Sequence, residues 1–310
     1  MKLFAFVFPG QGSQSVGMLD AWGGHPAVAE ALQEASDALG EDLGRLIREG
    51  PKEVLGLTTN TQPVMLIAGV AAYRAWRAEG GAEPYVLAGH SLGEYSALVA
   101  AGAMSLGDAA KSVRARGGFM QEAVPAGVGA MAAILGLEPA KVKAACEAAA
   151  EGQVVSPANY NSPEQTVIAG DAAAVERAGA KCKEAGAKRV MPLPVSAPFH
   201  CALMEPVKPK LAAVLGGVKL VAPSVPVVTN VEATPNSDVA RIVPLLLEQV
   251  SAPVRWIECV EALKAEGVTR VVELGPGKVL CGLIKRITKD IELFNVEDAA
   301  SLEKVLAALG

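Results

Sequence analysis

Residues 85–101 read YVLAGHSLGEYSALVAA and decide the fold. An apolar strand over 85–88 runs into the pattern G-x-S-x-G at 89–93, and a helix is predicted to follow over 92–101. This order is typical of a nucleophile elbow, whose glycines permit a strained turn that exposes the serine hydroxyl at a helix N-terminus. We therefore interpret Ser91 as a nucleophile. A serine that only caps the helix is the alternative.

A serine hydroxyl needs a base to remove its proton, and the chain has three histidines. His25 precedes a proline at a predicted helix start and is expected at the surface. His90 adjoins the nucleophile and is better suited to shaping the pocket. His200 is the predicted base because it follows the serine in the order that α/β-hydrolases use, with a purely structural histidine as the alternative. No acidic residue between Ser91 and His200 stands in an obvious strand-end loop, so a backbone carbonyl is a candidate for orienting the imidazole.

An oxyanion hole needs two N–H donors, and Leu92 supplies one because it directly follows the nucleophile. Gln11, between two glycines after a predicted strand over 3–8, is the candidate for the second. A nucleotide-binding loop is the competing interpretation, disfavoured because Ser15 stands at the third glycine position. An arginine fork at Arg116 would suit a carboxylate, although the residues alone favour a solvated charge on a helix face.

The segment 124–194 has its own pattern of predicted elements, in the order βαββαβ. That order is ferredoxin-like, and Pro125 and Gly127 at its start with Pro192 and Pro194 at its end indicate a subdomain inserted into a larger α/β body made of 1–123 and 195–310. In the larger body we also predict helices over 26–39, 61–78, from about 200, around 244 and over 254–265, and after 277, and strands over 225–229 and 270–274.

Composition supports an α/β protein and excludes several classes. Hydrophobic residues make up 51% of the 310 residues but aromatic residues only 4%, as helix-covered sheets often do. The net charge of -5 gives no basic field for nucleic acid. Five scattered cysteines lack metal-ligand spacing, which predicts no metal site and a reduced, cytoplasmic protein. The apolar run at the N-terminus is too short for a signal peptide or a membrane span.

Several motifs taken together resemble one family. They run from FPGQGS at 8–13, through GHSLGEYS at 89–96, Arg-Gly at 116–117 and PFH at 198–200, to ELGPG at 273–277. The chain resembles the malonyl-CoA:acyl carrier protein transacylases of bacterial fatty acid synthesis over essentially its whole length. The resemblance implies an α/β-hydrolase-like core with a ferredoxin-like insert.

The resemblance also implies roles for individual residues. Ser91 would carry the acyl group, His200 would be its base, and the amides of Gln11 and Leu92 would form the oxyanion hole. Gln249 matches the residue whose main-chain carbonyl holds the histidine. Arg116 matches the arginine that pairs with the malonyl carboxylate, which reverses the interpretation from the residues alone.

Further residues are expected near the substrate or the carrier protein. Phe199 looks like the malonyl-selective form of its motif, whose bulk opposes an α-methyl branch by about 1 to 3 kcal/mol. Asn159 and Asn161 match an insert loop that faces the cleft, with a plain Asx-rich turn as the alternative. Since carrier proteins of this kind are acidic, Lys188, Arg189, Lys285 and Arg286 are candidate docking residues, although solvated surface charge is the slightly favoured interpretation of each taken singly.

The expected reaction is a ping-pong transfer of malonyl from malonyl-CoA to the phosphopantetheine thiol of acyl carrier protein. It needs no cofactor, because the coenzyme A thioester is itself the substrate. The product would feed fatty acid elongation, and the protein is expected to be a monomer. A serine thioesterase that hydrolyses the acyl group and a scaffold that binds carrier protein without catalysis are the two alternatives.

Overall fold

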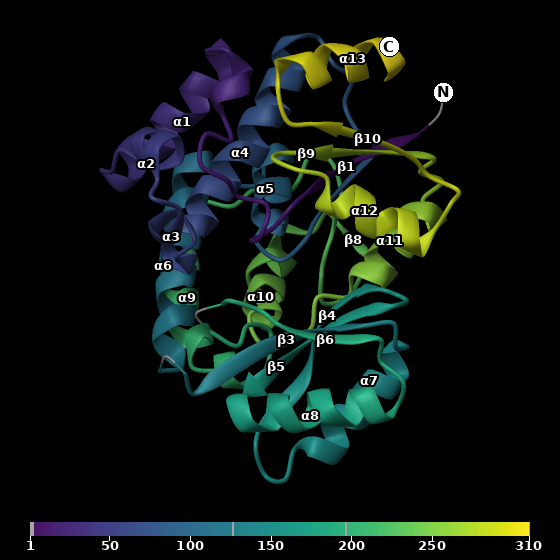
Figure 1. Ribbon diagram of the computed structural model, residues 1–310. Helices are drawn as coiled ribbons and strands as arrows, with labels where there is room; N and C mark the ends of the chain where they lie inside the picture. The colour runs from purple at the N-terminus through teal and green to yellow at the C-terminus, as the bar shows by residue number, and fades with distance from the viewer. Residues whose placement is uncertain (1–2, 126, 196, 310) are drawn as a thin grey trace.

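Two β-sheets of different size organise the protein (Figure 1). The structure is a computed structural model and describes residues 3–125, 127–195 and 197–309. Helices and strands alternate along the chain, and the prediction of a mixed α/β protein is confirmed. None of the helices in these ranges combines the length and the apolar character needed to cross a membrane.

The larger sheet has the strand order β10-β9-β1-β2-β7-β8. Its first five strands are parallel, and β8 is antiparallel to β7. Phe8 at the end of β1 pairs with Gly89 at the end of β2, so the loops that follow these two strands leave the sheet side by side. The strands are β1 (Phe4–Phe8), β2 (Val86–Gly89), β7 (Val227–Val228), β8 (Pro235–Asn236), β9 (Arg270–Leu274) and β10 (Glu292–Val296).

Helices cover both faces of this sheet because successive side chains of β1 point to opposite faces. Phe6 and Phe8 pack with α1, α4, α5 and α6 on one face. Ala5 and Val7 pack with α11 and α12 on the other. These helices are α1 (Pro26–Leu39), α4 (Thr58–Ala78), α5 (Gly93–Ala100), α6 (Leu106–Ala123), α11 (Trp256–Ala265) and α12 (Val279–Ile287).

The smaller sheet is antiparallel, with the strand order β4-β5-β3-β6. Helices α7 and α8 cover the face turned away from the rest of the protein (Figure 1). The opposite face packs against Phe199, Cys201 and Leu203. The elements are β3 (Gly129–Leu135), α7 (Pro139–Ala149), β4 (Val155–Ser162), β5 (Gln165–Asp171), α8 (Ala172–Glu184) and β6 (Arg189–Pro192).

Backbone hydrogen bonds join the smaller sheet to the rest of the chain. Val254 donates its N–H to the carbonyl of Ala158 at 2.8 Å, and Tyr160 donates to the carbonyl of Val254 at 2.9 Å. Strand β4 is therefore fixed beside the segment that connects α10 (Val239–Gln249) to α11.

The remaining elements differ in part from those expected. The helix predicted from about residue 200 begins only at Val207, after a short 3₁₀ turn, because Pro206 has no N–H with which to continue a helix from the turn before it. Helix α4 begins at Thr58 rather than at residue 61. The strand predicted over 225–229 is limited to β7. The other helices are the 3₁₀ helices η1 (Asp20–Trp22) and η2 (Ala202–Met204) and the α-helices α2 (Leu43–Glu49), α3 (Lys52–Leu55), α9 (Val207–Leu215), α10 (Val239–Gln249) and α13 (Ala299–Leu309).

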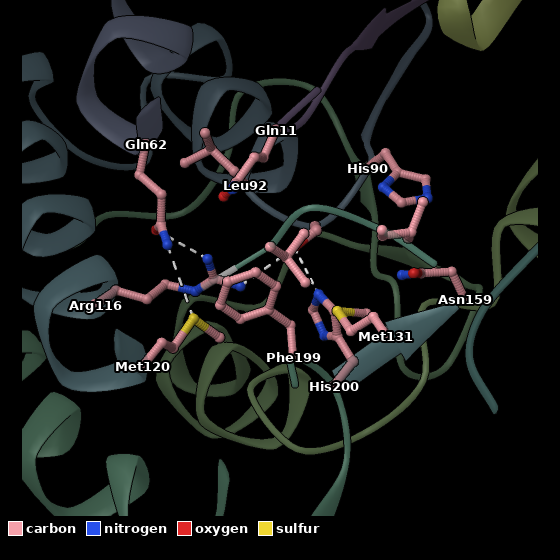
Figure 2. A pocket seen from close by; sticks show the side chains of 13 residues that line it. Gln11, Gln62, His90, Leu92, Arg116, Met120, Met131, Asn159, Phe199 and His200 are labelled. Atoms are coloured by element: carbon pink, nitrogen blue, oxygen red, sulfur yellow. Dashed lines mark hydrogen bonds between the residues drawn. The ribbon is translucent and has the colours of Figure 1, made fainter. Parts of the chain in front are cut away.

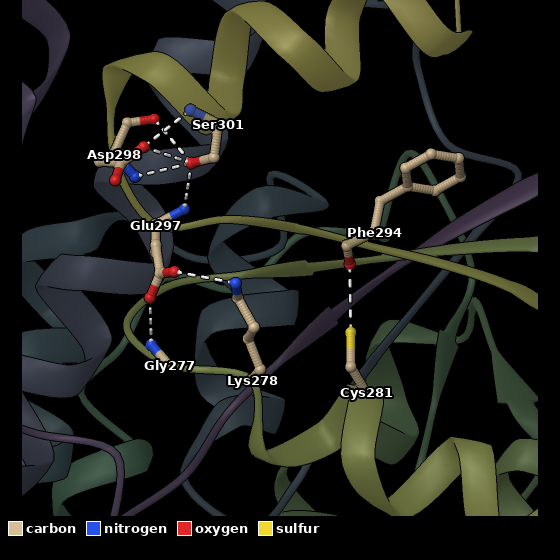
Figure 3. A network of polar contacts seen from close by, with 7 residues as sticks. All are labelled: Gly277, Lys278, Cys281, Phe294, Glu297, Asp298 and Ser301. Carbon is tan, nitrogen blue, oxygen red and sulfur yellow. Dashed lines mark hydrogen bonds and ion pairs between the residues drawn. The ribbon is translucent and has the colours of Figure 1, made fainter.

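A polar network fixes α13 against the loop after β9 (Figure 3). Glu297 accepts a hydrogen bond from the N–H of Gly277 at 3.0 Å and pairs with Lys278 at 3.6 Å. Ser301 Oγ accepts the N–H groups of Glu297 and Asp298, both at 3.0 Å, and its own N–H donates to the Asp298 carboxylate at 2.7 Å. The first turn of α13 is thus capped by side chains.

Candidate active site

Ser91 occupies the sharp turn between β2 and α5, with a positive φ of 53° that non-glycine residues rarely adopt. The turn is closely packed. A Cβ atom on Gly89 would lie 1.9 Å from the carbonyl carbon of Gly93, and one on Gly93 would lie 2.0 Å from the carbonyl oxygen of Phe8. Both glycines of the G-x-S-x-G pattern are therefore required by backbone contact, and the Ser91 side chain is presented beyond the end of the sheet.

His200 lies within hydrogen-bonding distance of the serine. Its Nε2 is 2.7 Å from Ser91 Oγ, and its Nδ1 is 2.8 Å from the main-chain carbonyl of Gln249. Since a carbonyl only accepts, Nδ1 carries the proton and Nε2 is left to accept one from the serine. Burial, reinforced by the nearby charge of Arg116, lowers the pKa of His200 to about 3, so the ring is neutral near pH 7.

Gln11 and Leu92 line the same cavity. The loop after β1 approaches the elbow closely, since a Cβ atom on Gly10 would lie 2.6 Å from the His90 carbonyl oxygen. Within the described part of the chain, neither amide donates to a backbone carbonyl. This leaves both N–H groups without a backbone acceptor, a condition that the predicted oxyanion hole requires.

Arg116, on α6, is 2% exposed, which excludes the solvent-facing charge that its residue type and position alone favoured. Its Nη1 donates to Gln62 Oε1 at 2.9 Å, and its Nη2 donates to Gln249 Oε1 at 2.9 Å and to Ser91 Oγ at 3.3 Å. Its Nε–H has no partner among the described residues. Burial lowers its pKa, but a guanidinium stays protonated in proteins, so the site holds a buried cation beside the serine.

These groups line a cavity of about 120 Å³ between the two sheets. Figure 2 shows the Arg116 and His200 side chains pointing into the same space, with Gln11 and Leu92 on its upper side in that view. Strand β3 contributes Met131, and β4 contributes Asn159. Within the described residues, no three His, Cys, Asp or Glu side chains are grouped to hold a metal ion. The full lining is Gln11, Gln62, His90, Ser91, Leu92, Arg116, Met120, Met131, Asn159, Leu193, Val195, Phe199 and His200.

Known proteins are similar to this chain in sequence and in fold over nearly their whole length. Residues 5–305 match the model of the acyl transferase domain family. A malonyl CoA-acyl carrier protein transacylase of Escherichia coli (strain K12) is 54% identical over 307 residues, 99% of each chain. The chain belongs to the malonyl-CoA:acyl carrier protein transacylase family. The resemblance inferred from the motifs is confirmed.

Solved structures of transacylases have the same fold as this chain. An acyl-carrier-protein S-malonyltransferase from Burkholderia pseudomallei has a TM-score of 0.96 and 55% identity, covering 98% of this chain and 99% of that one. A malonyl-transacylase solved in complex with its type II PKS acyl-carrier protein has a TM-score of 0.97 and 50% identity, covering 99% of both chains.

The two asparagines that the transacylase motifs pointed to lie in a strand. Asn159 and Asn161 belong to β4, so the expected loop and the alternative Asx-rich turn are both wrong, although Asn159 does face the cavity as expected. The strand forms because β4 pairs with β5 on one edge and contacts Val254 on the other. Asn161 Oδ1 is 2.8 Å from His90 Nε2, while Asn159 lines the cavity. Burial lowers the pKa of His90, which favours a neutral ring in this position.

The four docking candidates are exposed and lie outside the cavity lining. Lys188 pairs with Glu164 at 3.9 Å across the end of the smaller sheet, close to Arg189 in β6. Arg286, next to Lys285 on α12, donates to Gln165 Oε1 at 3.0 Å and so reaches from the larger body to the smaller sheet.

Three polar residues in this transacylase site were not predicted from the sequence. Gln62 and Asn230 each contact a site residue, and Glu94 contacts both Asn230 and Gln249. The sequence did contain a signal for Asn230. It directly follows the predicted strand over 225–229, and polar residues at the carboxyl ends of parallel strands often belong to binding sites. Gln62 and Glu94 lie inside helical segments, where a polar side chain gives no such signal.

Proposed function

We propose that the protein transfers the malonyl group from malonyl-CoA to the phosphopantetheine thiol of acyl carrier protein through a malonyl ester on Ser91. One arrangement carries the proposal: Ser91 Oγ lies 2.7 Å from a neutral imidazole and 3.3 Å from a buried guanidinium. The first pair suits nucleophilic attack, and the guanidinium suits a substrate carboxylate. The names of the close relatives, malonyl CoA-acyl carrier protein transacylase, support the same reaction.

In the first half-reaction, His200 Nε2 takes the proton of Ser91 as Oγ attacks the thioester carbonyl carbon. The resulting oxyanion accepts hydrogen bonds from the amides of Gln11 and Leu92. As the carbonyl re-forms, the C–S bond breaks, and the imidazolium returns its proton to the coenzyme A sulfur. Malonyl-Ser91 and coenzyme A thiol are the products.

The second half-reaction runs the same path in reverse. His200 takes the proton of the carrier thiol, whose sulfur attacks the ester carbonyl. The C–Oγ bond then breaks, and Ser91 recovers its proton. Throughout both steps the Gln249 carbonyl keeps the imidazole in one tautomer, which makes the base part of a Ser-His dyad.

The remaining cavity residues are proposed to select and hold the acyl group. Arg116 pairs with the malonyl carboxylate and fixes the thioester relative to Ser91. The Phe199 ring limits space for an α-methyl branch. His90, held by Asn161, and Asn159 complete the wall nearest the smaller sheet.

The finer fold assignment is also a proposal: an α/β-hydrolase-like core, 1–123 and 195–310, with a ferredoxin-like subdomain at 124–194. It is supported by the parallel order of the larger sheet and by the βαββαβ order of the smaller unit. Residues 1, 2, 126, 196 and 310, which fall within these ranges, lie outside the described residues.

We further propose fatty acid elongation as the destination of the product, a cytoplasmic location, a monomeric protein and a reaction without a cofactor. The five free cysteines support the reducing compartment. The transfer itself breaks and forms only ester and thioester bonds, which His200 and the oxyanion amides suffice to catalyse.

Intact-protein mass after mixing with malonyl-CoA tests the function. Wild type should gain one malonyl group, Ser91→Ala should gain none, and the matched variant Ser36→Ala on α1 should behave as wild type. Acetyl-CoA should give a much weaker adduct. Release of coenzyme A without an adduct would instead indicate a thioesterase, and no release at all would leave a non-catalytic scaffold.

Carrier docking is tested in the second half-reaction alone. Starting from malonyl-enzyme, Lys285→Glu combined with Arg286→Glu, and Lys188→Glu combined with Arg189→Glu, should slow transfer to carrier protein, most strongly at low salt. Neither pair should change the formation of malonyl-enzyme. Lys141→Glu with Lys143→Glu, on α7, is the matched control. Fatty acid and polyketide carriers assayed side by side test the proposed destination.

A further inference from the structure

A buried carboxylate that takes no part in these reaction steps lies behind the nucleophile. Glu94 belongs to the first turn of α5 and is 2% exposed. Its Oε2 accepts hydrogen bonds from the N–H of Asn230 at 3.0 Å and from Gln249 Nε2 at 2.8 Å. Burial raises the pKa of Glu94 to about 7, against the opposing effect of these bonds and of Arg116. Burying a carboxylate costs free energy. The other contacts of its two hydrogen-bond partners indicate what the buried group does.

The first partner, Asn230, holds the backbone of the elbow. Its Oδ1 accepts the Ser91 N–H at 2.6 Å, and its Nδ2 donates to the Gly89 carbonyl at 2.7 Å. These two bonds lie on either side of His90 and hold the backbone that leads into Ser91, the residue with the positive φ. Asn230 is fully buried, so water does not offer its backbone N–H a ready replacement for Glu94.

The second partner, Gln249, contacts all three groups that the proposed chemistry uses. Its Nε2 also donates to the Ser91 carbonyl at 3.0 Å, and its Oε1 accepts from Arg116 Nη2 at 2.9 Å. Its main-chain carbonyl accepts from His200 Nδ1 at 2.8 Å. The side-chain amide of Gln249 therefore contacts the nucleophile residue and the cation, while its main chain holds the base.

We propose that Glu94 is a positioning residue, which acts through Asn230 and Gln249 to keep Ser91 and His200 in their reacting geometry. This inference rests on the proposed function. Without the Glu94 acceptor, the Asn230 N–H loses its partner, and the Gln249 amide keeps only its bonds to the Ser91 carbonyl and Arg116. A shift of about 1 Å between reacting atoms is enough to slow a reaction by about 10²-fold.

A second buried carboxylate offers a matched comparison. Glu273, at the end of β9, is also fully buried and also accepts two hydrogen bonds, from the N–H groups of Leu280 at 3.1 Å and Cys281 at 2.8 Å. Burial raises its pKa as well. Its partners are at the start of α12 and contact neither Ser91 nor His200. Its replacement should affect stability and leave the chemistry unchanged.

The test compares full-length Glu94→Ala, Glu94→Gln and Glu273→Ala with wild type. The readouts are the rate of malonyl-Ser91 formation at saturating malonyl-CoA, the KM for malonyl-CoA, and the melting temperature. Glu94→Ala should lower the saturated rate by about 10²-fold with little change in KM, because Arg116 and the cavity wall remain. Glu94→Gln should recover most of the rate because its carbonyl oxygen can still accept. Glu273→Ala should lower the melting temperature without lowering the rate.

Two results would overturn the inference. One is a folded Glu94→Ala whose saturated rate stays within about threefold of wild type. The other is a Glu94→Gln as slow as Glu94→Ala, which would assign the effect to charge rather than to hydrogen bonding. If Glu94→Ala does not fold, Glu94→Leu, which fills the space of the side chain but accepts no hydrogen bond, replaces it with the same expected loss. A wild type that forms no malonyl-enzyme contradicts the proposed function instead, so the two failures are distinguishable.

Discussion

His200 Nε2 and Ser91 Oγ lie 2.7 Å apart, and both residues adopt a left-handed backbone conformation, with φ of 58° and 53°. Each such conformation costs of order 1 to 3 kcal/mol for a non-glycine residue and persists only when the surroundings hold it. Here the surroundings are the Asn230 bonds on the serine side and the Gln249 carbonyl on the histidine side. The hydrogen bond between Ser91 and His200 is thus formed before substrate binds.

Replacement of His200 tests whether that hydrogen bond supplies the base. His200→Ala should slow the formation of malonyl-Ser91 by about 10²- to 10⁴-fold, since proton removal by a positioned side chain is lost. His25→Ala is the matched control, because His25 caps α1 and pairs with Glu79 away from the cavity. Stopped-flow measurement of coenzyme A release gives the rate. A loss of less than about tenfold would assign the base to another group.

Arg116 is expected to determine the preference for a dicarboxylic acyl group. Arg116→Ala should lower the ratio of kcat/KM for malonyl-CoA over acetyl-CoA by roughly 10- to 100-fold, the effect of losing a charged hydrogen bond of about 1.5 to 3 kcal/mol. The ratio cancels damage common to both substrates, including the loss of a partner for Gln249. Arg114→Ala on the same helix is the control, since Arg114 contacts Thr59, Asn60 and Glu41. An unchanged ratio would leave Arg116 a purely structural cation.

The sequence predicted those helices and strands that are defined by residues within or next to the element itself. Helix α1 and strand β9 have the predicted bounds, because apolar spacing and flanking Pro and Gly residues define them. The extent of helix α6 was not predicted beyond the helix face assumed at Arg116, because its Arg-Ala-Arg-Gly-Gly stretch weakens the helical signal. Packing against α1 and α4 stabilises the helix nonetheless. The two-residue strand β8 exists only through its pairing with β7.

The residues of the candidate site also differ in whether the local sequence predicts them. Ser91 is found from its local turn, and His200 from being one of three histidines. The expectation that Gln249 holds the imidazole came from the family resemblance, since a main-chain carbonyl leaves no mark in a sequence. Glu94 and Asn230 are 136 positions apart, and their contact depends on the complete fold. No local pattern could have revealed it.

Stability should depend on pH through Glu94 in a direction that can be stated in advance. Its pKa is about 7 in the folded protein against an ordinary value of 4.5, so the folded state holds more protons between these values. The contribution of Glu94 to the free energy of unfolding is therefore present below about pH 4.5 and is lost, by about 3 kcal/mol, as the pH rises through about 7. Glu94→Gln should gain stability relative to wild type across that window.

His200 should act in the opposite direction. Its pKa falls from 6.5 to about 3, so its contribution is present above about pH 6.5 and is lost as the pH falls toward 3. His200→Gln should therefore gain relative stability as the pH decreases. Urea unfolding of both variants and wild type, from about pH 5 to about pH 8, measures these differences. A difference from wild type that is independent of pH would contradict the assignment of either group.

Two glycine substitutions should have opposite effects on stability. Gly89→Ala places a Cβ 1.9 Å from the Gly93 carbonyl carbon and should cost about 3 kcal/mol or more, because backbone must move. Gly282→Ala, in the middle of α12 with open space around its Cβ position, should stabilise by about 0.5 to 1 kcal/mol. Urea midpoints measure both. Equal midpoints for the two variants would show that the elbow adapts more easily than its contacts indicate.

The positive φ of Ser91 and His200 also offers a way to measure how much of a preparation is correctly folded. Neither residue would keep that conformation in a relaxed chain, so a serine-directed acylating reagent should label Ser91 rapidly only in molecules whose whole surrounding structure is intact. The amplitude of that labelling is then an active-site titration. It gives the fraction of competent protein in a preparation, which neither total absorbance nor bulk purity can provide.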